Sequence, residues 1–116
     1  MTIKHLTAAE VARDLKAGNI LLIDVREPGE YESERIHGAL LFPLSTFDPG
    51  SLPKCGTREV VFQCGSGVRS AVAVAACRKA GLPHDSHLKG GIQAWKAARL
   101  PTITVNPATG KPRDRR

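Results

Sequence analysis

The sequence predicts an α/β protein built around a largely parallel sheet. Short apolar runs typical of buried strands alternate along the chain with longer segments that have helical spacing. At 116 residues the chain has the length of one domain, long enough for a core of its own and too short for two ordinary domains. An apolar fraction of 41 % and a charged fraction of 24 % are typical of a soluble globular protein.

The first predicted elements are a helix over residues 8–17 and a buried strand. Thr7 and Glu10 form the capping box T-x-x-E that starts a helix, and Gly18 follows at the position of a C-cap. The stretch "ILLIDV" then begins at Ile20. Its four consecutive aliphatic residues indicate a strand buried on both faces, which is the habit of parallel sheets.

The remaining strands and helices are predicted to alternate up to about residue 101. Pro28 and Gly29 interrupt the chain after the first strand and leave room for a short helix before residue 39. The segment 68–80 is almost entirely apolar, and its four alanines between 71 and 76 let a helix pack closely on a sheet. The other strands are predicted at "ALLFP" (39–43), "VVFQ" (60–63) and "SHLK" (86–89), and the last helix at "GGIQAWKAARLP" (90–101).

The cysteines and histidines give no sign of a disulfide framework or of a zinc site. The three cysteines lie 9 and 13 residues apart and form no C-x-x-C motif, which indicates reduced thiols. The four histidines have no metal-ligand spacing with them, so no metal is expected. These residues are Cys55, Cys64 and Cys77, and His5, His37, His84 and His87.

Half of the formal charge of +6 lies at the C-terminus. The last ten residues, "PATGKPRDRR", hold four cations and one anion and contribute +3 of it. They lack aromatic residues and an apolar period. We therefore expect a folded domain over residues 1–101, a basic flexible tail over residues 102–116, and no nucleic-acid partner. No apolar run approaches the ~20 residues of a membrane span and the N-terminus has no apolar signal segment, so we expect no membrane partner and a cytoplasmic location.

Cys64 is the strongest candidate for chemistry. It directly follows a predicted strand, at the edge of a parallel sheet where ligands bind. The loop 65–67 can curl so that its amides form an anion-binding nest, the next helix adds the positive end of its dipole, and Arg69 adds a charge. Ser70 can donate a further hydrogen bond to the sulfur. Together these groups are expected to lower the pKa of Cys64 below the ~8.5 of a free thiol and to make it a nucleophile.

The other residues of reactive types are interpreted as structural. Cys77 lies inside the alanine-rich helix and is expected in the core, whereas Cys55 is an incidental thiol in a polar loop. The remaining interpretations are hydrogen bonds between loops for Asp24 and Arg26, a turn for His37 and a core position for Trp95.

Three motifs resemble those of the single-domain rhodaneses. They are "LIDVREPGEYESERIHGALLFPL", the loop "CGSGVRS" with the signature C-x-x-G-x-R-S, and "LKGGIQAW". They stand in order and properly spaced, and the resemblance runs from about Leu6 to Pro101. It implies a three-layer α/β/α domain around a mainly parallel, five-stranded sheet, with no metal or organic cofactor.

The resemblance also implies a function, which is transfer of sulfane sulfur through a cysteine persulfide. Cys64 corresponds to the sulfur carrier, which takes sulfur from a donor such as thiosulfate and gives it to a thiol or cyanide. Tandem-domain rhodaneses that use thiosulfate tend to carry extra cations at the pocket mouth, whereas "VREPGEYESE" is rich in acid here. A polysulfide or a protein persulfide is therefore an equally good donor. The residues that correspond to the substrate-binding cradle are Gly65, Ser66, Gly67, Val68, Arg69 and Ser70.

Two alternatives to sulfur transfer remain. Cell-cycle phosphatases and some arsenate reductases share this fold, but their loops read C-x5-R, whereas Cys64 to Arg69 reads C-x4-R. The shorter ring of amides suits a single sulfur atom better than a tetrahedral oxyanion. The second alternative is a non-catalytic binding or regulatory module, because a fold alone does not fix a function.

Overall fold

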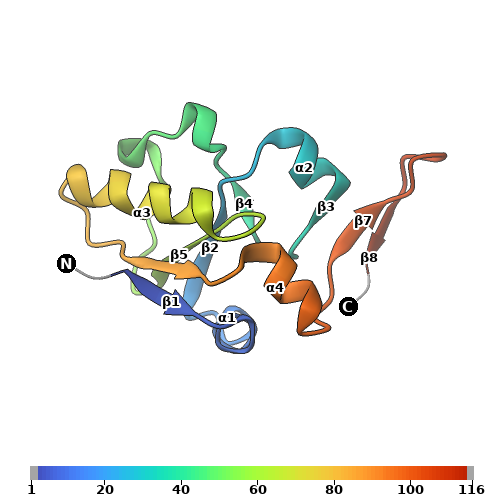
Figure 1. Cartoon of the computed structure of the whole chain (residues 1–116), viewed down its shortest axis with the longest axis horizontal. Coiled ribbons are helices and arrows are strands. Elements are labelled where there is room, and N and C mark those ends of the chain that lie inside the picture. The colour runs from blue at the N-terminus through green and yellow to red at the C-terminus, as the bar shows by residue number, and fades with distance from the viewer. Residues whose placement is uncertain (1–2, 115–116) are drawn as a thin grey trace.

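A parallel sheet of five strands forms the centre of the molecule (Figure 1). The structure is a computed structural model that describes residues 3–114. The strand order is β1-β6-β5-β2-β4, and every neighbouring pair is parallel, which confirms the predicted α/β class. The strands are β1 (Lys4–Leu6), β2 (Ile20–Asp24), β4 (Leu40–Leu41), β5 (Glu59–Gln63) and β6 (Ser86–Leu88).

Within the described residues, four helices connect the strands, close to the predicted positions. The capping box is present, because the Glu10 amide donates to Thr7 Oγ1 at 3.2 Å and the Thr7 amide donates to Glu10 Oε1 at 3.1 Å. The helices are α1 (Ala8–Lys16), α2 (Pro28–Ser33), α3 (Val68–Lys79) and α4 (Gly91–Ala97). Two 3-10 turns, η1 (Leu44–Thr46) and η2 (Pro49–Ser51), fill the loop before β5.

The helices cover both faces of the sheet and give the three-layer α/β/α architecture (Figure 1). Helices α1 and α4 pack on one face through Val11 and Trp95, and α3 packs on the other face through Ala73 and Val74. All five residues of β2 are buried, as its aliphatic run predicted. Burial of each of its four aliphatic side chains stabilises the fold by about 1.5–3 kcal/mol, so the central strand holds the two helical layers together.

Strand β1 was missed by the sequence analysis, although it supplies the fifth strand. It has three residues, two of them exposed, and it lies at the edge of the sheet. Its partner is β6, with His5 opposite His87 in parallel register. A strand this short and polar has no local hydrophobic signal, and only pairing with residues more than 80 positions away fixes it.

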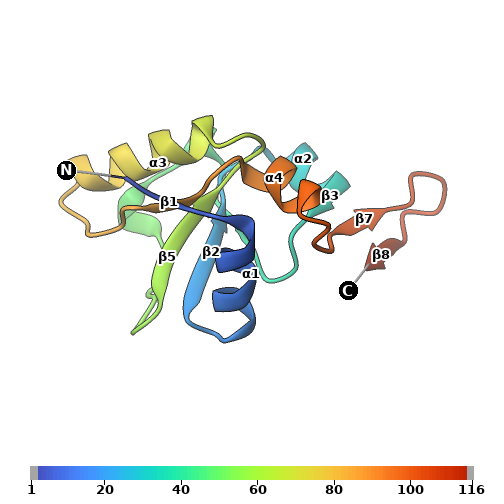
Figure 2. The ribbon, with the colours of Figure 1, turned by 60° about the horizontal axis from the view of Figure 1, so that its bottom comes forward.

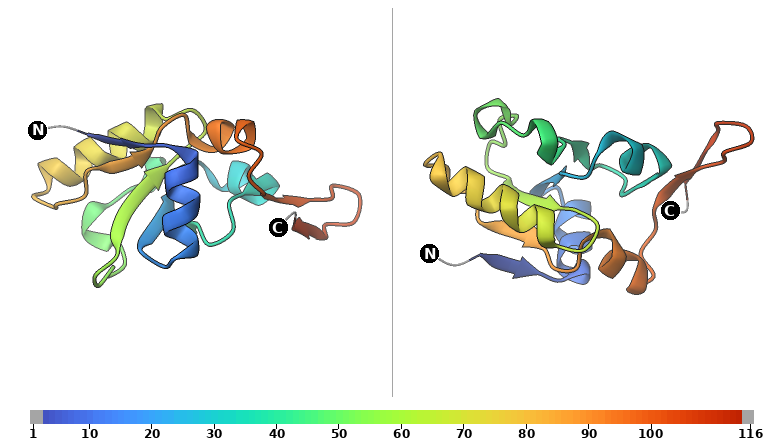
Figure 3. Two further views of the ribbon diagram at one scale, coloured as in Figure 1. Left: turned by 90° about the horizontal axis from the view of Figure 1, so that it is seen from below. Right: turned by 45° about the horizontal axis from the view of Figure 1, so that its top comes forward.

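The segment after residue 101 contains two strands that the sequence analysis did not predict. Strand β7 (Ile103–Val105) pairs antiparallel with β3 (Glu34–Arg35), and β8 (Pro112–Asp114) pairs with β7. Thr102 is buried and its Oγ1 donates to Glu34 Oε2 at 2.7 Å. The hairpin extends away from the main sheet (Figures 2 and 3). The flexibility of the tail stays a prediction. Within residues 3–114, no helix is long and apolar enough to span a membrane.

Candidate active site

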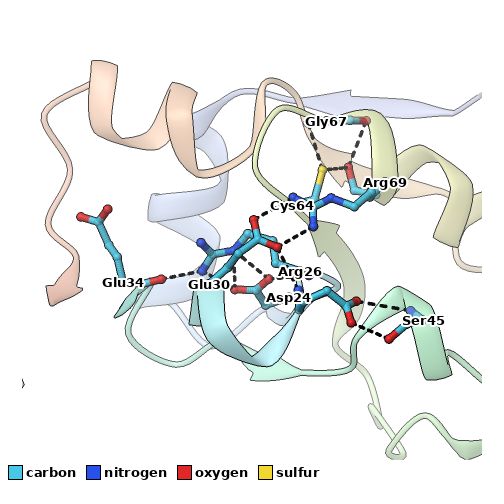
Figure 4. A network of polar contacts seen from close by, with 10 residues as sticks. Asp24, Arg26, Glu30, Glu34, Ser45, Cys64, Gly67 and Arg69 are labelled. Atoms are coloured by element: carbon cyan, nitrogen blue, oxygen red, sulfur yellow. Dashed lines mark hydrogen bonds and ion pairs between the residues drawn. The ribbon is translucent and has the colours of Figure 1, made fainter. Parts of the chain in front are cut away.

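Cys64 lies where β5 ends and the loop to α3 begins. Its sulfur accepts a hydrogen bond from the Gly67 amide at 3.0 Å (Figure 4). Gly67 has a φ of +99°, which a residue with a side chain rarely adopts, and this conformation turns its amide back toward the sulfur. The residue Cys64 has 0 % exposed surface. The loop therefore has to move before a donor molecule can touch the sulfur.

The hydrogen bonds around Cys64 outweigh the effect of its burial. Burial by itself raises the pKa of the thiol, because it penalises the thiolate. The Ser70 hydroxyl, 3.6 Å from the sulfur, and the backbone groups of Ser70, Gly67 and Ser66 act in the opposite direction. The net result is a pKa below the ordinary value, as the sequence predicted. A thiol in this setting forms a thiolate more readily than a free cysteine does.

The N-terminus of α4 holds the other side of the loop. The amide of Ile92 donates to the carbonyl oxygen of Cys64 at 2.8 Å, and the amide of Gln93 donates to that of Gly65 at 3.2 Å. The approach is so close that a Cβ on Gly91 would lie 2.1 Å from the Cys64 carbonyl oxygen. The glycine pair of "LKGGIQAW" therefore lets helix and loop meet backbone to backbone.

Arg69 has a partner that the sequence did not indicate. Its two Nη atoms donate to Glu30 of α2, at 2.6 and 2.9 Å (Figure 4), while its charge also interacts with Cys64, as expected. These hydrogen bonds hold the pKa of Glu30 down at about 2. The guanidinium thus shares its charge with a carboxylate and joins the Cys64 loop to α2.

Comparison with known proteins identifies the family. A family model described as the rhodanese-like domain matches residues 7–98. The chain belongs to the rhodanese-like domain family.

Relatives of this rhodanese-like domain include proteins named as sulfurtransferases. The chain is 41 % identical over 105 residues to the probable adenylyltransferase/sulfurtransferase MoeZ of Mycobacterium tuberculosis, a match that covers 86 % of this chain and 26 % of that protein. It is 36 % identical over 87 residues to a sulfurtransferase of Allochromatium vinosum, which covers 73 % of this chain and 79 % of that protein. The rhodanese-like domain thus spans only about a quarter of the length of the mycobacterial relative.

The fold agrees with this assignment. The solution structure of a rhodanese-like domain from Anabaena matches with a TM-score of 0.75 and 29 % identity, over 92 % of this chain and 86 % of that domain. The rhodanese-like fold and a kinship with sulfur-transferring enzymes are therefore shown.

Asp24 and Arg26 form a buried ion pair beside the site of the rhodanese-like domain (Figure 4). Arg26 Nη2 donates to Asp24 Oδ2 at 2.9 Å and to the Glu34 carbonyl oxygen at 2.6 Å. Both side chains are buried, with 6 % and 0 % exposed surface. Glu27 accepts hydrogen bonds from the backbone and hydroxyl of Ser45. These contacts confirm the prediction that Asp24 and Arg26 tie loops together.

The other predicted residues lie where the sequence analysis expected them. Cys77 is buried in an apolar cluster, and burial raises the pKa of its thiol to about 11. Trp95 is buried and its Nε1 donates to the Pro101 carbonyl oxygen at 2.8 Å. His37 is exposed in a turn, and Cys55 is partly buried in its loop. In the predicted cradle, Ser66 and Val68 are exposed and make no contact with the sulfur through their side chains among the described hydrogen bonds.

Two histidines that the sequence did not connect with Cys64 lie beside the site. Ser70 Oγ lies 2.7 Å from His87 Nδ1, and His87 Nε2 lies 2.7 Å from His5 Nδ1. On the sequence alone, His5 and His87 are weighed only as metal ligands. Because these contacts span 17 and 82 residues of sequence, no local spacing could have joined them.

Proposed function

We propose that this chain is a sulfurtransferase that carries sulfane sulfur as a persulfide on Cys64. The observation that supports it most directly is the hydrogen bond from the Gly67 amide to the Cys64 sulfur, at 3.0 Å. This contact belongs to a set of hydrogen bonds that lowers the pKa of a buried thiol. The thiolate, not the thiol, is the nucleophile in sulfur chemistry, so the loop favours the reactive form.

The proposed reaction has two steps. The Cys64 thiolate attacks the outer sulfur of thiosulfate; a new S–S bond forms, the old S–S bond breaks, and its electron pair leaves with sulfite. An acceptor such as cyanide or a thiolate then attacks the outer sulfur of the persulfide. Thiocyanate or a new persulfide departs, and the thiolate of Cys64 is regenerated. Neither step needs an external oxidant or reductant, and the scheme is of the ping-pong type.

The loop residues serve both states of the cysteine in this proposal. The outer sulfur of a persulfide carries a negative charge, as the thiolate does. Donors that turn toward Cys64 can hold either anion, because they are fixed before the reaction begins. Gly65, Ser66, Gly67, Val68, Arg69 and Ser70 form this cradle. The loop must open for loading, since Cys64 has no exposed surface.

The charges around the loop bear on the sulfur donor. Arg69 is paired with Glu30, and Glu27 also lies on this side of the domain, bonded to Ser45. Thiosulfate is a dianion, and a guanidinium that is already neutralised by a carboxylate attracts it weakly. We therefore place polysulfides and persulfides of proteins or small thiols beside thiosulfate as donors, with a thiol or cyanide as the acceptor.

A phosphatase or arsenate reductase is supported less well. Such an enzyme needs its loop arginine to bind the oxyanion, but both Nη atoms of Arg69 donate to Glu30 here. The C-x4-R ring also has one amide fewer than the C-x5-R ring. Both features favour a small sulfur anion over a tetrahedral oxyanion.

The mass of the protein tests the proposal. Protein incubated with excess thiosulfate or polysulfide, without an acceptor, should gain one sulfur atom, and cyanide should remove it. Peptide mapping should place the sulfur on Cys64 and not on Cys55 or Cys77. If neither donor loads a reduced and folded protein, the non-catalytic binding module becomes the better explanation. Turnover of an aryl phosphate instead would favour the phosphatase.

A further inference from the structure

A chain of hydrogen bonds leads from the Cys64 sulfur to the edge of the sheet. Ser70 Oγ lies 3.6 Å from the sulfur and 2.7 Å from His87 Nδ1. The second ring nitrogen of His87, Nε2, lies 2.7 Å from Nδ1 of His5. Each neighbour in this chain can pass a proton to the next, because hydroxyl and imidazole groups both donate and accept hydrogen bonds.

The burial of these residues explains why such a chain matters. Cys64 and Ser70 have 0 % exposed surface and His87 has 3 %. A thiol must lose its proton before it becomes a nucleophile, and a buried thiol cannot hand that proton to water directly. His5 lies on the edge strand β1 and is exposed. The chain therefore reaches solvent at His5.

Three separate elements hold the chain in place. Ser70 lies in the first turn of α3, His87 in β6 and His5 in β1. The two histidines are register partners in the parallel β1–β6 pair, so their side chains lie on the same face of the sheet. Their rings are 4.7 Å apart and meet edge to face at 65°. The alignment is thus fixed by strand pairing and not by a flexible loop.

We propose that Ser70, His87 and His5 form a proton relay that carries the proton of the Cys64 thiol to solvent at the β1 edge of the sheet. The proposal rests on the proposed function in that Cys64 is the reacting sulfur. It adds a route for the proton that the loop amides cannot provide, because amides stabilise the thiolate but do not accept its proton.

The proton transfers balance along the whole relay. Before ionisation, the thiol donates to Ser70 Oγ, the Ser70 hydroxyl donates to His87 Nδ1, and Nε2–H of His87 donates to His5 Nδ1. Each proton then moves one place along, and His5 releases its Nε2 proton to water. Afterwards every hydrogen bond points the other way, from His5 Nδ1–H to His87 Nε2, from His87 Nδ1–H to Ser70, and from Ser70 to the thiolate. The net change is one thiolate and one proton in solvent.

The surroundings of His87 suit a relay. The titratable groups that face it are His5 from β1 and, through Ser70 of α3, Cys64 at the end of β5. Burial, and then the neighbouring His5, lower the pKa of His87, which keeps the ring neutral at neutral pH. A neutral imidazole has one donor and one acceptor nitrogen, as a relay member must.

The tautomer of His87 tests the relay in the unaltered protein. Nitrogen NMR of the imidazole rings should show the His87 proton on Nε2 while Cys64 is a thiol and on Nδ1 once it is a thiolate. The signals of His5 should change at the same pH. In Cys64→Ser this transition should be absent. A His87 ring that keeps one tautomer through the ionisation of Cys64 would rule the relay out. No sulfur donor is used, so the result is independent of whether the protein transfers sulfur.

Variants test the rate of proton release. After a rapid upward pH jump, the ultraviolet absorbance of the Cys64 thiolate should appear in His87→Phe at a rate roughly ten times lower, or less, than in the wild type. His5→Ala changes an exposed residue and should also slow it, and imidazole in the buffer should restore the rate. His84→Gln is the control, because His84 is also partly buried, in the loop before β6, but contacts Phe62 instead of the relay. Equal rates in all folded variants would contradict the proposal.

Discussion

Cys64 and Cys77 are both buried, but the pKa values of their thiols differ in opposite directions from the ordinary value. Cys64 precedes α3 and Cys77 lies in its last turn, and both have 0 % exposed surface. Burial is the largest influence on each thiol and raises the pKa in both places. At Cys77 nothing opposes it and the pKa rises to about 11, whereas at Cys64 the hydrogen bonds of the loop bring the pKa below its ordinary value. The difference in pKa therefore comes from the Ser70 hydroxyl and the backbone groups around Cys64, not from its depth in the protein.

Removal of each thiol is the change that tests this comparison most strongly. Cys64→Ser should abolish sulfur transfer, because the hydroxyl of serine is not ionised at neutral pH and cannot form a persulfide. Cys77→Ala should leave turnover largely intact while it lowers the free energy of unfolding by about 1 kcal/mol through the lost packing. The measurements are thiosulfate or polysulfide turnover and urea unfolding.

Cys55→Ser serves as the control for the loss of a thiol outside the core. It should leave both turnover and stability near those of the wild type. A large loss of turnover in Cys55→Ser would instead identify Cys55 as a resolving thiol.

Gly91→Ala should have the next largest effect on turnover. The new Cβ would lie 2.1 Å from the Cys64 carbonyl oxygen, at a φ of +59° that favours glycine, so loop and α4 must separate. We expect turnover to fall by roughly a hundredfold or more, the size of effect seen when fixed donors around a reacting anion are lost. The pKa of Cys64 should rise, as burial raises that of Cys77. The pH dependence of alkylation measures this change.

Gly18→Ala is the matched control for this substitution. Gly18 also has a positive φ, +75°, but a Cβ there would meet nothing within 4 Å. It carries the same conformational penalty without the collision. If Gly18→Ala were as inactive as Gly91→Ala, the close approach of α4 to the loop would not be the cause.

Arg69 and Glu30 should have a moderate effect on activity. Lysine keeps the charge but cannot donate from two nitrogens to one carboxylate, so Arg69→Lys should lose almost as much turnover as Arg69→Ala, roughly tenfold, or about 1.4 kcal/mol in the barrier. Near-wild-type turnover of the lysine variant would show that charge alone suffices.

The same pair gives a small pH dependence of stability. The pKa of Glu30 is lowered from 4.5 to about 2 by Arg69, so its contribution is fully present above pH 4.5 and is lost as the pH falls through about 2. Because both side chains are partly exposed, we expect less than about 1 kcal/mol. Unfolding of Glu30→Gln across this pH range should lack that component, whereas an unchanged pH profile would contradict the assignment.

Deletion of residues 107–116 should have the smallest effect, because the described part of this segment, residues 107–114, buries little surface. Its described residues are almost entirely exposed, and β8 pairs only with β7. The melting temperature and the turnover should stay nearly unchanged. A drop of many degrees would show that the hairpin stabilises the domain.

Much of the fold follows from local patterns. The capping box before α1, the aliphatic run of β2 and the alanine-rich α3 each specify their own element, because propensity, capping and burial act within a few residues. Strands β1 and β8 lack such a signal, because most of their residues are polar or, like proline, unfavourable in strands. Strand β7 has three β-branched residues, but a run of three is too short to specify a strand by itself. These strands form through pairing with partners elsewhere in the chain, such as β6 for β1.

The candidate site also has a part that is local in the sequence and a part that depends on packing. Seven consecutive residues, 64–70, are enough to place Cys64 at a strand end before glycines and a helix, because that arrangement is local. The groups around Cys64 come from other elements and depend on tertiary packing. Glu30 of α2 pairs with Arg69, the N-terminus of α4 donates hydrogen bonds to the loop carbonyls, His87 lies beside Ser70, and His5 lies beside His87. These partners come from elements 17 to 82 residues away, and packing of strands and helices, not spacing along the chain, brings them together.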